Sequence, residues 1–134
     1  MKYLLDTNIC IYIINRRPPA VLERFRGHPL GAIGISSITA GELAFGVAKS
    51  GSPKNRRALE MFLAPLEVAP FGGDSMWAYG GLRATLERKG RPIGSLDTLI
   101  AAHALTLSAI LVTNDIGEFG RVAGLKMENW AKAS

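Results

Sequence analysis

The sequence predicts an α/β fold, a three-layer α/β/α arrangement in which a central parallel sheet of about four to five strands lies between helices. Short apolar runs alternate with longer helical segments along the whole chain, which is the pattern of right-handed βαβ crossovers. Ser, Thr, Asp or Gly residues mark most of the boundaries. With 134 residues, 48% of them hydrophobic, the chain can bury one sizeable core, so we expect residues 1–134 to form a single domain.

Short apolar runs provide the expected strands. They span residues 2–5, 32–35, 66–68 and 109–113, and residues 125–127 are a candidate edge strand. Each run is shorter than an ordinary helix and is bounded by turn or capping residues. The first run ends at Asp6 and the fourth leads into Asn114 and Asp115, so two of the predicted strands are followed by a carboxylate.

Six segments between the strands are predicted to be helical. They are residues 9–14, residues 20–26, a stretch capped within 36–39 that ends near 49, and residues 54–63, 74–89 and 96–107. Asp6, Thr7 and Asn8 offer N-caps that favour a helix for the first segment despite its isoleucines. The Gly80-Gly81 pair is costly inside a helix, and it predicts a close helical neighbour at that point.

The composition restricts the classes of protein to which the chain can belong. The single cysteine, Cys10, excludes an intramolecular disulfide, and a structural zinc site is not expected with only His28 and His103 available. Asp6 interrupts the first apolar run, which excludes a signal-peptide core, and no apolar stretch reaches the roughly 18 to 20 residues of a membrane span. We expect a cytoplasmic protein that does not insert into a membrane.

The chain is basic, with a formal net charge of +5 and a pI near 9.7. The basic residues gather at Arg16-Arg17, at Arg24 with Arg26, at Lys54 with Arg56-Arg57, and at Arg83 with Arg88-Lys89 and Arg91. A basic surface around an acidic pocket suits a polyanion that is held by its phosphates while a metal ion acts at the bond to be cut. Each cluster taken alone is more typical of a solvated face.

Four carboxylates stand where an apolar segment meets a turn or a helix start: Asp6, Glu42, Asp97 and Asp115. Parallel strands bring their carboxyl ends to one edge of a sheet, where ligands bind, so these acids can share one pocket. Oxygen-only clusters are what Mg²⁺ and Mn²⁺ prefer. Neighbouring carboxylates also raise each other's pKa, and a bound divalent cation relieves that repulsion. Glu118 is a fifth candidate, which could replace or assist Asp115.

Each acid also has a purely structural interpretation. Asp6 can cap the helix that follows it, and Glu42 stands three residues after Thr39, which is the spacing of a capping box. Asp97 lies in the first turn of a helix, where a negative charge complements the helix dipole. Asp115 can be an ordinary turn residue. The two interpretations differ in geometry, because only the functional one requires the acids to share a sheet edge.

Four motifs, taken in order, resemble those of the PIN domain. They are Leu4-Leu5-Asp6-Thr7-Asn8, residues 35–39 with Gly41-Glu42-Leu43, the run from Arg91 to Ala104 around Asp97, and Val112-Thr113-Asn114-Asp115 continuing to Glu118-Phe119. More narrowly, the whole chain resembles the VapC-type toxins of bacterial toxin–antitoxin pairs. The ordered set of motifs is far more specific than any one of them.

The resemblance implies a Mg²⁺- or Mn²⁺-dependent endoribonuclease that acts on structured RNA, often tRNA or ribosomal RNA. It also implies a homodimer and a cognate antitoxin that blocks the active site and links the toxin to DNA only indirectly. The implied catalytic residues are Asp6, Glu42, Asp97 and Asp115, and the implied metal ligands are Asp6, Asp97, Asp115 and Glu118. Members of the family place the fourth acid at the position of either Asp115 or Glu118, and both positions are acidic here.

Further residues are expected to support the site. Thr7, Asn8, Thr113 and Asn114 match polar positions that surround the metal ligands, so they are expected to orient ligands or to contact the substrate. Arg88, Lys89 and Arg91 lead into the turn before Asp97, and they are the basic residues nearest in sequence to that acid. We therefore expect these three to bind RNA phosphates.

Two other functions fit parts of the sequence. An aspartate-based phosphomonoesterase or phosphoacceptor domain carries its nucleophile after the first strand, as Asp6 does, but the companion acid two residues later is replaced by Asn8 and no clear catalytic lysine follows a later strand. A PIN-like module that binds RNA or protein without cutting is the second alternative. Retention of all the acids weighs against it, because a non-catalytic relative has no reason to keep their repulsion.

Overall fold

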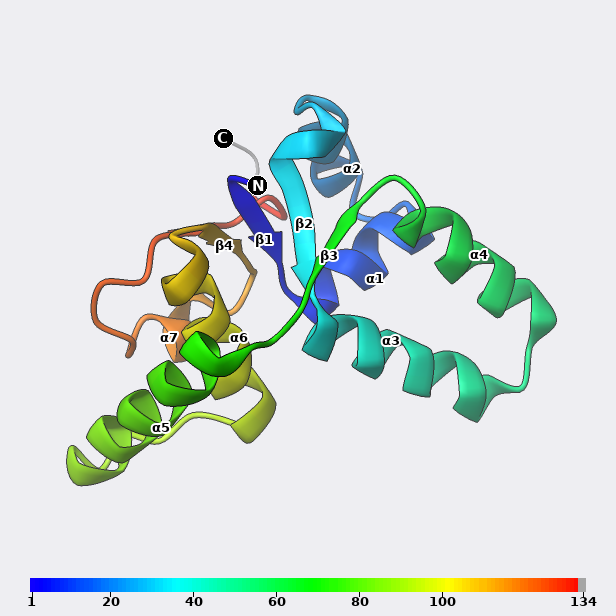
Figure 1. Cartoon of the computed structure of the whole chain (residues 1–134). Helices are drawn as coiled ribbons and strands as arrows, with labels where there is room; N and C mark the ends of the chain where they lie inside the picture. Colours follow the sequence, from blue (N-terminus) through cyan, green and yellow to red (C-terminus); the bar gives the residue numbers. More distant parts are fainter. Residues whose placement is uncertain (133–134) are drawn as a thin grey trace.

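The computed structural model describes residues 1–132, and it contains one five-stranded sheet in the order β3-β2-β1-β4-β5 (Figure 1). The strands are β1 (Tyr3–Leu5), β2 (Ile33–Ser36), β3 (Glu67–Ala69), β4 (Ile110–Val112) and β5 (Met127–Glu128). Every neighbouring pair is parallel, and Leu4 of β1 lies opposite both Gly34 and Leu111. The carboxyl end of the central strand β1 therefore lies between those of β2 and β4.

Helices cover both faces of this sheet, with α1–α4 on one side and α5–α7 on the other (Figure 1). They are α1 (Thr7–Asn15), α2 (Pro19–Arg26), α3 (Ser37–Ser50), α4 (Pro53–Leu63), α5 (Gly73–Arg88), α6 (Ser95–Leu107) and α7 (Ile116–Phe119), with a 3-10 turn, η1, at Leu30–Ala32. Side chains alternate along β1, so Tyr3 and Leu5 enter the core beneath α1–α4, whereas Leu4 enters the core beneath α6 and α7. The predicted three-layer α/β/α fold is confirmed.

Several boundaries differ from those expected. The third strand is residues 67–69 rather than 66–68, and the fifth is residues 127–128 rather than 125–127. The short helix α7 was not expected at all. It forms because the side chain of Asp115, predicted to lie in a turn, accepts a hydrogen bond from the Glu118 amide at 3.0 Å and caps the helix.

The predicted helical neighbour of Gly80 and Gly81 is not formed within residues 1–132. Both glycines are exposed, and a Cβ atom added at either would meet nothing within 4 Å. Helix α5 packs against α6 instead through the face that carries Ser75 and Leu86, both of which are buried. Neither glycine is therefore needed for a close approach of α6 to α5.

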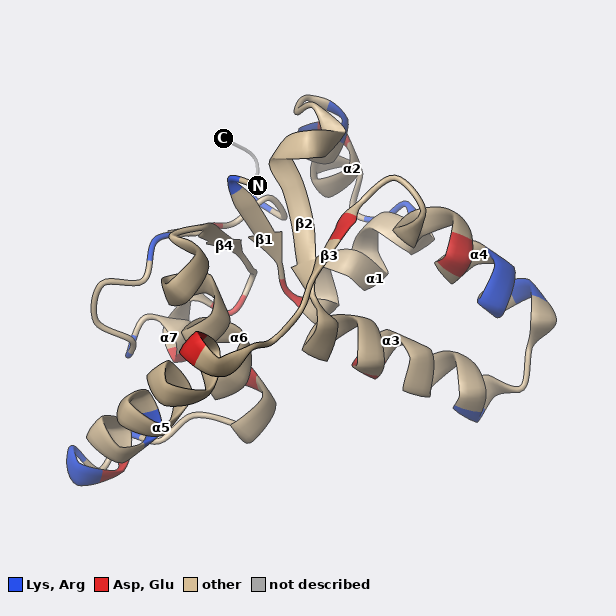
Figure 2. Ribbon diagram, in the orientation of Figure 1, with Lys and Arg blue, Asp and Glu red and all other residues tan. Residues whose placement is uncertain are grey.

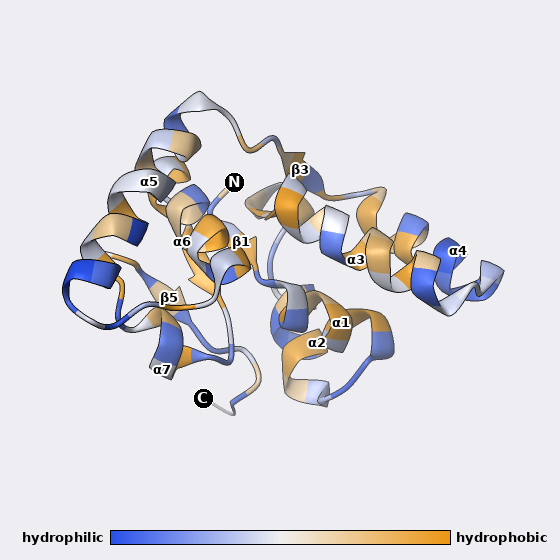
Figure 3. Ribbon diagram, turned by 90° about the horizontal axis from the view of Figure 1, so that it is seen from below, coloured by the Kyte–Doolittle hydropathy of each residue, from blue (hydrophilic) through white to orange (hydrophobic). Residues whose placement is uncertain are grey.

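Apolar residues also reach the surface. Figure 3 shows hydrophobic residues along α1 and α3, and the exposed large side chains include Phe45, Met61 and Trp77. Trp77 on α5 is 77% exposed. Across residues 1–132, no helix has the combined length and apolar character that crossing a membrane requires.

Candidate active site at the carboxyl edge of the sheet

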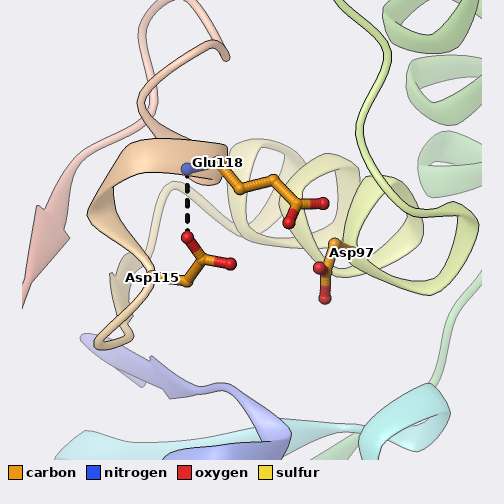
Figure 4. A group of neighbouring side chains, drawn as sticks. All are labelled: Asp97, Asp115 and Glu118. Carbon is orange, nitrogen blue, oxygen red and sulfur yellow. Dashed lines mark hydrogen bonds between the residues drawn. The ribbon is translucent and has the colours of Figure 1, made fainter.

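Three carboxylates meet at the edge of the sheet where β1 and β4 end. Asp97 comes from the first turn of α6, while Asp115 and Glu118 come from the segment that follows β4. Each residue offers one carboxylate oxygen, and these three oxygens all lie within 4.8 Å of one another. Figure 4 shows the three side chains facing a common space. The sequence-predicted convergence of these acids is therefore present.

Asp6 lies beside this group and performs a structural role as well. Its side chain, only 5% exposed, accepts a hydrogen bond from the Ile9 amide at 2.9 Å and so caps α1. Burial raises the pKa of Asp6; hydrogen bonds from Thr113 and Ile9 partly offset this effect, and the charges of Asp115 and Glu42 add to it. The capping interpretation of Asp6 is thus correct, and it does not exclude the functional one.

Asp97 is the most strongly perturbed of the acids. Burial and then the adjacent charge of Glu118 raise its pKa to about 7, and the charges of Asp6 and Asp115 act in the same direction. The donors are all oxygens, they are close enough to share one ion, and they repel one another when ionised. These properties fit a hard divalent cation such as Mg²⁺ or Mn²⁺.

Glu42 belongs to the margin of the site rather than to the three-carboxylate group. Its Oε1 accepts a hydrogen bond from the Thr7 hydroxyl at 2.9 Å, and its charge acts on Asp6. The capping-box interpretation of Glu42 is wrong, because Ser36 rather than Thr39 caps α3. The helix begins three residues earlier than that spacing assumed, so Glu42 lies in its second turn and reaches back toward α1.

Thr113 joins two of the acids. Its hydroxyl oxygen accepts a hydrogen bond from the Asp115 amide at 2.9 Å, and the same side chain hydrogen-bonds to Asp6. Asn8 is exposed. Asn114 donates to the hydroxyl of Tyr12 at 2.8 Å, which ties the end of β4 to α1. No local sequence signal points to Tyr12, because it lies 102 positions from its partner.

Glu118 also holds the segment that precedes α6. Its Oε1 accepts a hydrogen bond from the amide of Gly94, the N-cap residue of α6, at 2.7 Å. Arg121 reinforces this contact by donating to the carbonyl of Pro92 at 2.9 Å. The turn that carries the chain into Asp97 is thereby fastened once to α7 and once to the segment that follows it.

The basic residues predicted to bind RNA lie outside the acidic group. Arg88 ends α5, and Lys89 and Arg91 follow it; all three are exposed. Figure 2 shows basic residues at the free end of α5. The side chain of Arg88 donates to the Thr85 hydroxyl at 3.3 Å, so its contact within the chain is local to its own helix. Their RNA-binding role remains a prediction.

The fold and the acidic edge together are those of a PIN domain. The PIN domain family matches residues 3–125, which is nearly the whole chain. The chain therefore belongs to the PIN-domain family, as the sequence motifs predicted.

Its relatives define the group within that family. The chain is 46% identical to Ribonuclease VapC2 of Rickettsia felis, over 98% of this chain and all of that protein. It is 42% identical to the tRNA(fMet)-specific endonuclease VapC of Shigella flexneri, over 98% of this chain and 99% of that protein. At these identities, and over whole chains, the assignment is to the VapC-type ribonucleases.

Solved structures agree with this assignment. DNA-bound VapBC from Salmonella typhimurium contains a chain that superposes with a TM-score of 0.91 at 40% identity, covering 97% of this chain and 98% of that one. VapBC2 from Rickettsia felis, bound to a DNA fragment from its promoter, gives a TM-score of 0.88 at 43% identity, covering 97% and 99%. The similarity therefore extends over both chains in three dimensions.

Proposed function

We propose that this VapC-type ribonuclease is a metal-dependent endoribonuclease and the toxin of a toxin–antitoxin pair. The observation that carries the proposal is the group formed by Asp97, Asp115 and Glu118, whose oxygens lie within 4.8 Å of one another beside the buried Asp6. These acids repel one another, and a repelling oxygen cluster is a poor structural device but a good divalent-cation site. RNA phosphodiesters are the substrate class that matches both the site and the basic surface.

The proposed function assigns a role to each group of site residues. Asp6, Asp97, Asp115 and Glu118 would hold one or two Mg²⁺ or Mn²⁺ ions, and Glu42 would act as a further ligand or orient the attacking water. When bound, the cation supplies Lewis-acid stabilisation of charge on the phosphate and lowers the pKa of water. Thr113 hydrogen-bonds to Asp6 and to the Asp115 amide and so holds these two residues relative to each other. Thr7 orients the Glu42 carboxylate by donating a hydrogen bond to it. Arg88, Lys89 and Arg91 would bind RNA phosphates.

The relatives support a structured RNA as target and a protein partner. One relative is named for its specificity toward tRNA(fMet), and two similar chains were solved as VapBC on DNA. We propose tRNA or ribosomal RNA as the substrate, with cleavage in the cytoplasm, and a cognate antitoxin that covers the acidic edge and carries the DNA contact. Exposed apolar side chains, among them Phe45 and Trp77, support a homodimer.

The test is cleavage of defined RNAs by the purified protein. Initiator tRNA, elongator tRNA and ribosomal RNA fragments are incubated with Mg²⁺ or Mn²⁺, with and without EDTA, alongside the Asp97→Asn variant. We expect cleavage that requires the cation and Asp97, leaving a 3′-hydroxyl and a 5′-phosphate. Cleavage that survives exhaustive chelation would remove the metal mechanism.

The same preparation separates the two alternative functions. A phosphomonoesterase would hydrolyse p-nitrophenyl phosphate and trap phosphate on Asp6, whereas the endoribonuclease should leave this small substrate unchanged. A non-catalytic module would retain RNA in a binding assay without releasing new 5′-phosphate ends. Either result would replace the proposal with the corresponding alternative.

A further inference from the structure

A buried histidine joins two helices that carry candidate active-site acids. His103 lies on α6, six residues after Asp97, and is only 1% exposed. Its Nδ1 is 2.8 Å from the hydroxyl oxygen of Ser36. The ring also hydrogen-bonds to the backbone of Pro70 and meets the Phe71 ring edge-on, with 5.4 Å between the centroids. The imidazole is therefore held on several sides.

The other partners of Ser36 and His103 together assign the direction of this hydrogen bond. It is the last residue of β2 and the N-cap of α3, and its hydroxyl oxygen accepts a hydrogen bond from the Ile38 amide at 3.0 Å. The hydroxyl proton is then free to be donated to Nδ1 of His103, while the other ring nitrogen donates to the Pro70 carbonyl. A neutral imidazole with its proton on Nε2 satisfies every group in this chain of contacts.

We propose that His103 is a positioning residue for the candidate active site. Its contact with Ser36 sets α6, which carries Asp97, against the start of α3, which carries Glu42 six residues after Ser36. The two helices belong to opposite layers of the fold, and the contact spans the sheet edge between them. This inference rests on the proposed function, because it assigns His103 an effect on the metal-binding acids.

The ordinary alternative is a core histidine that contributes only stability. An apolar residue would fill the same space without the cost of burying polar atoms, so the retained hydrogen bonds require a reason. The bonds of His103 and Ser36 join α6 to the ends of β2 and β3 and to the start of α3, and two of these elements carry candidate acids. Positioning predicts a change in metal affinity, whereas a stabilising role predicts a change in thermal stability alone.

The decisive comparison uses two substitutions of nearly equal shape. His103→Asn keeps an oxygen near the place of Nδ1 that can accept from Ser36, whereas His103→Leu keeps the volume and loses the acceptor. Ser75→Ala is the matched control, because it removes the 2.8 Å contact of Ser75 with Thr106, which joins α6 to α5 instead of α3. For each protein, Mn²⁺ affinity is measured by calorimetry, and kcat and KM are measured on RNA at saturating Mn²⁺.

We expect His103→Leu to weaken Mn²⁺ binding and to lower kcat, each by about tenfold, with little change in KM. The Mn²⁺ affinity and kcat of His103→Asn should stay within about threefold of the wild-type values, and those of Ser75→Ala should equal the wild-type values. Wild-type Mn²⁺ affinity and kcat in His103→Leu, with only the melting temperature lowered, would overturn the inference. A wild-type protein that neither binds Mn²⁺ nor cleaves RNA would instead defeat the proposed function.

Ser36→Ala keeps the inference testable if His103→Leu does not fold. This variant removes the hydrogen bond from the other side, and it should show the same loss of Mn²⁺ affinity. Wild-type Mn²⁺ affinity and kcat in Ser36→Ala would overturn the inference.

Discussion

Glu128 and the group of acids at the carboxyl edge of the sheet differ in how the chain compensates their charge. On the side of the sheet covered by α2, Glu128 accepts hydrogen bonds from Arg24 at 3.2 Å and from the indole of Trp130 at 3.0 Å. The indole is fully buried and stacks on His28 with 5.2 Å between the centroids. The charge of Glu128 is thus neutralised within the chain.

The acids at the carboxyl edge have no such partner. Within residues 1–132, no lysine or arginine forms a salt bridge with Asp97, Asp115 or Glu118. Their mutual repulsion contributes to raising the pKa of Asp97 to about 7. The two regions therefore differ in charge compensation rather than in hydrogen bonding, and an uncompensated group of acids is what a bound divalent cation would neutralise.

The largest effect should come from removing a candidate ligand. Asp97→Asn and Asp6→Asn should each lower the rate of RNA cleavage by about a thousandfold, because the amide cannot supply the charge that holds the cation. Without metal, Asp97→Asn should unfold at the same temperature as the wild type or at a higher one, because it removes one member of a repelling group. A wild-type cleavage rate would show that the residue is not a ligand.

The fourth acid can be identified by comparing Asp115→Asn, Glu118→Gln and the double variant. Both side chains contribute an oxygen to the 4.8 Å group, so we expect each single change to cost roughly 10- to 100-fold in activity and the double change to cost more. Steady-state cleavage at saturating Mg²⁺ measures this. If one single variant equals the double variant, that residue alone is the ligand.

The basic end of α5 should affect binding more than chemistry. Replacing Arg88, Lys89 and Arg91 with alanine should weaken RNA binding by roughly tenfold at 0.15 M salt and flatten the plot of log affinity against log salt, because each phosphate contact contributes somewhat less than one unit of slope. Thermal unfolding serves as the control, since the stems of these side chains can cover apolar surface. An unchanged slope would point to Lys54, Arg56 and Arg57 as the RNA path.

The raised pKa of Asp97 makes the stability of the metal-free protein depend on pH. A carboxyl whose pKa is higher in the folded state binds more protons when folded, so its contribution is present below pH 4 and is lost as the pH rises toward 7. Urea unfolding in EDTA should show this loss, superimposed on the other titrating groups, and Asp97→Asn should reduce it. Saturating Mg²⁺ should oppose the loss near pH 7 and release protons as it binds. If the free energy of unfolding depended on pH equally in the wild type and in Asp97→Asn, the raised pKa of Asp97 would be contradicted.

The smallest effect should come from the neutralised acid. Glu128→Gln makes the same change of group as Asp97→Asn, but we expect it to destabilise the fold by roughly 0.5 kcal/mol and to leave RNA cleavage unchanged, because the pair with Arg24 is partly exposed and the amide oxygen can still accept from Trp130. Paired thermal and cleavage assays test this. A loss of activity would show that the two regions are coupled.

The sequence was sufficient for those features that depend on local patterns. Apolar runs bounded by caps predicted the strands, and acids placed after β1 and β4 predicted the shared edge, because parallel strands bring their ends together. Local signals also competed at the start of α3. Ser36, Ser37 and Thr39 all offered caps there, and only the structure shows that Ser36 is the cap, which removes the capping-box interpretation of Glu42.

Hydrogen bonds between residues far apart in the sequence could not be predicted from local sequence patterns. Glu118 and Gly94 are 24 positions apart, and His103 and Ser36 are 67 apart. Nothing in the composition or periodicity of either segment specifies such a partner. Helix α7 was missed for a related reason, because four residues are too few to produce a helical pattern and its formation depends on the Asp115 cap.

The double use of the Glu118 carboxylate limits how this position can change over evolutionary time. One oxygen is engaged by the Gly94 amide, and the group as a whole adds charge beside Asp97. Glutamine could keep the bond to the amide but would give up the charge. Aspartate would keep the charge on a stem shorter by one methylene, and would lose reach toward the amide. Neither substitution keeps both the hydrogen bond and the charge at their present positions. We therefore expect residue 118 to change only together with the turn before α6.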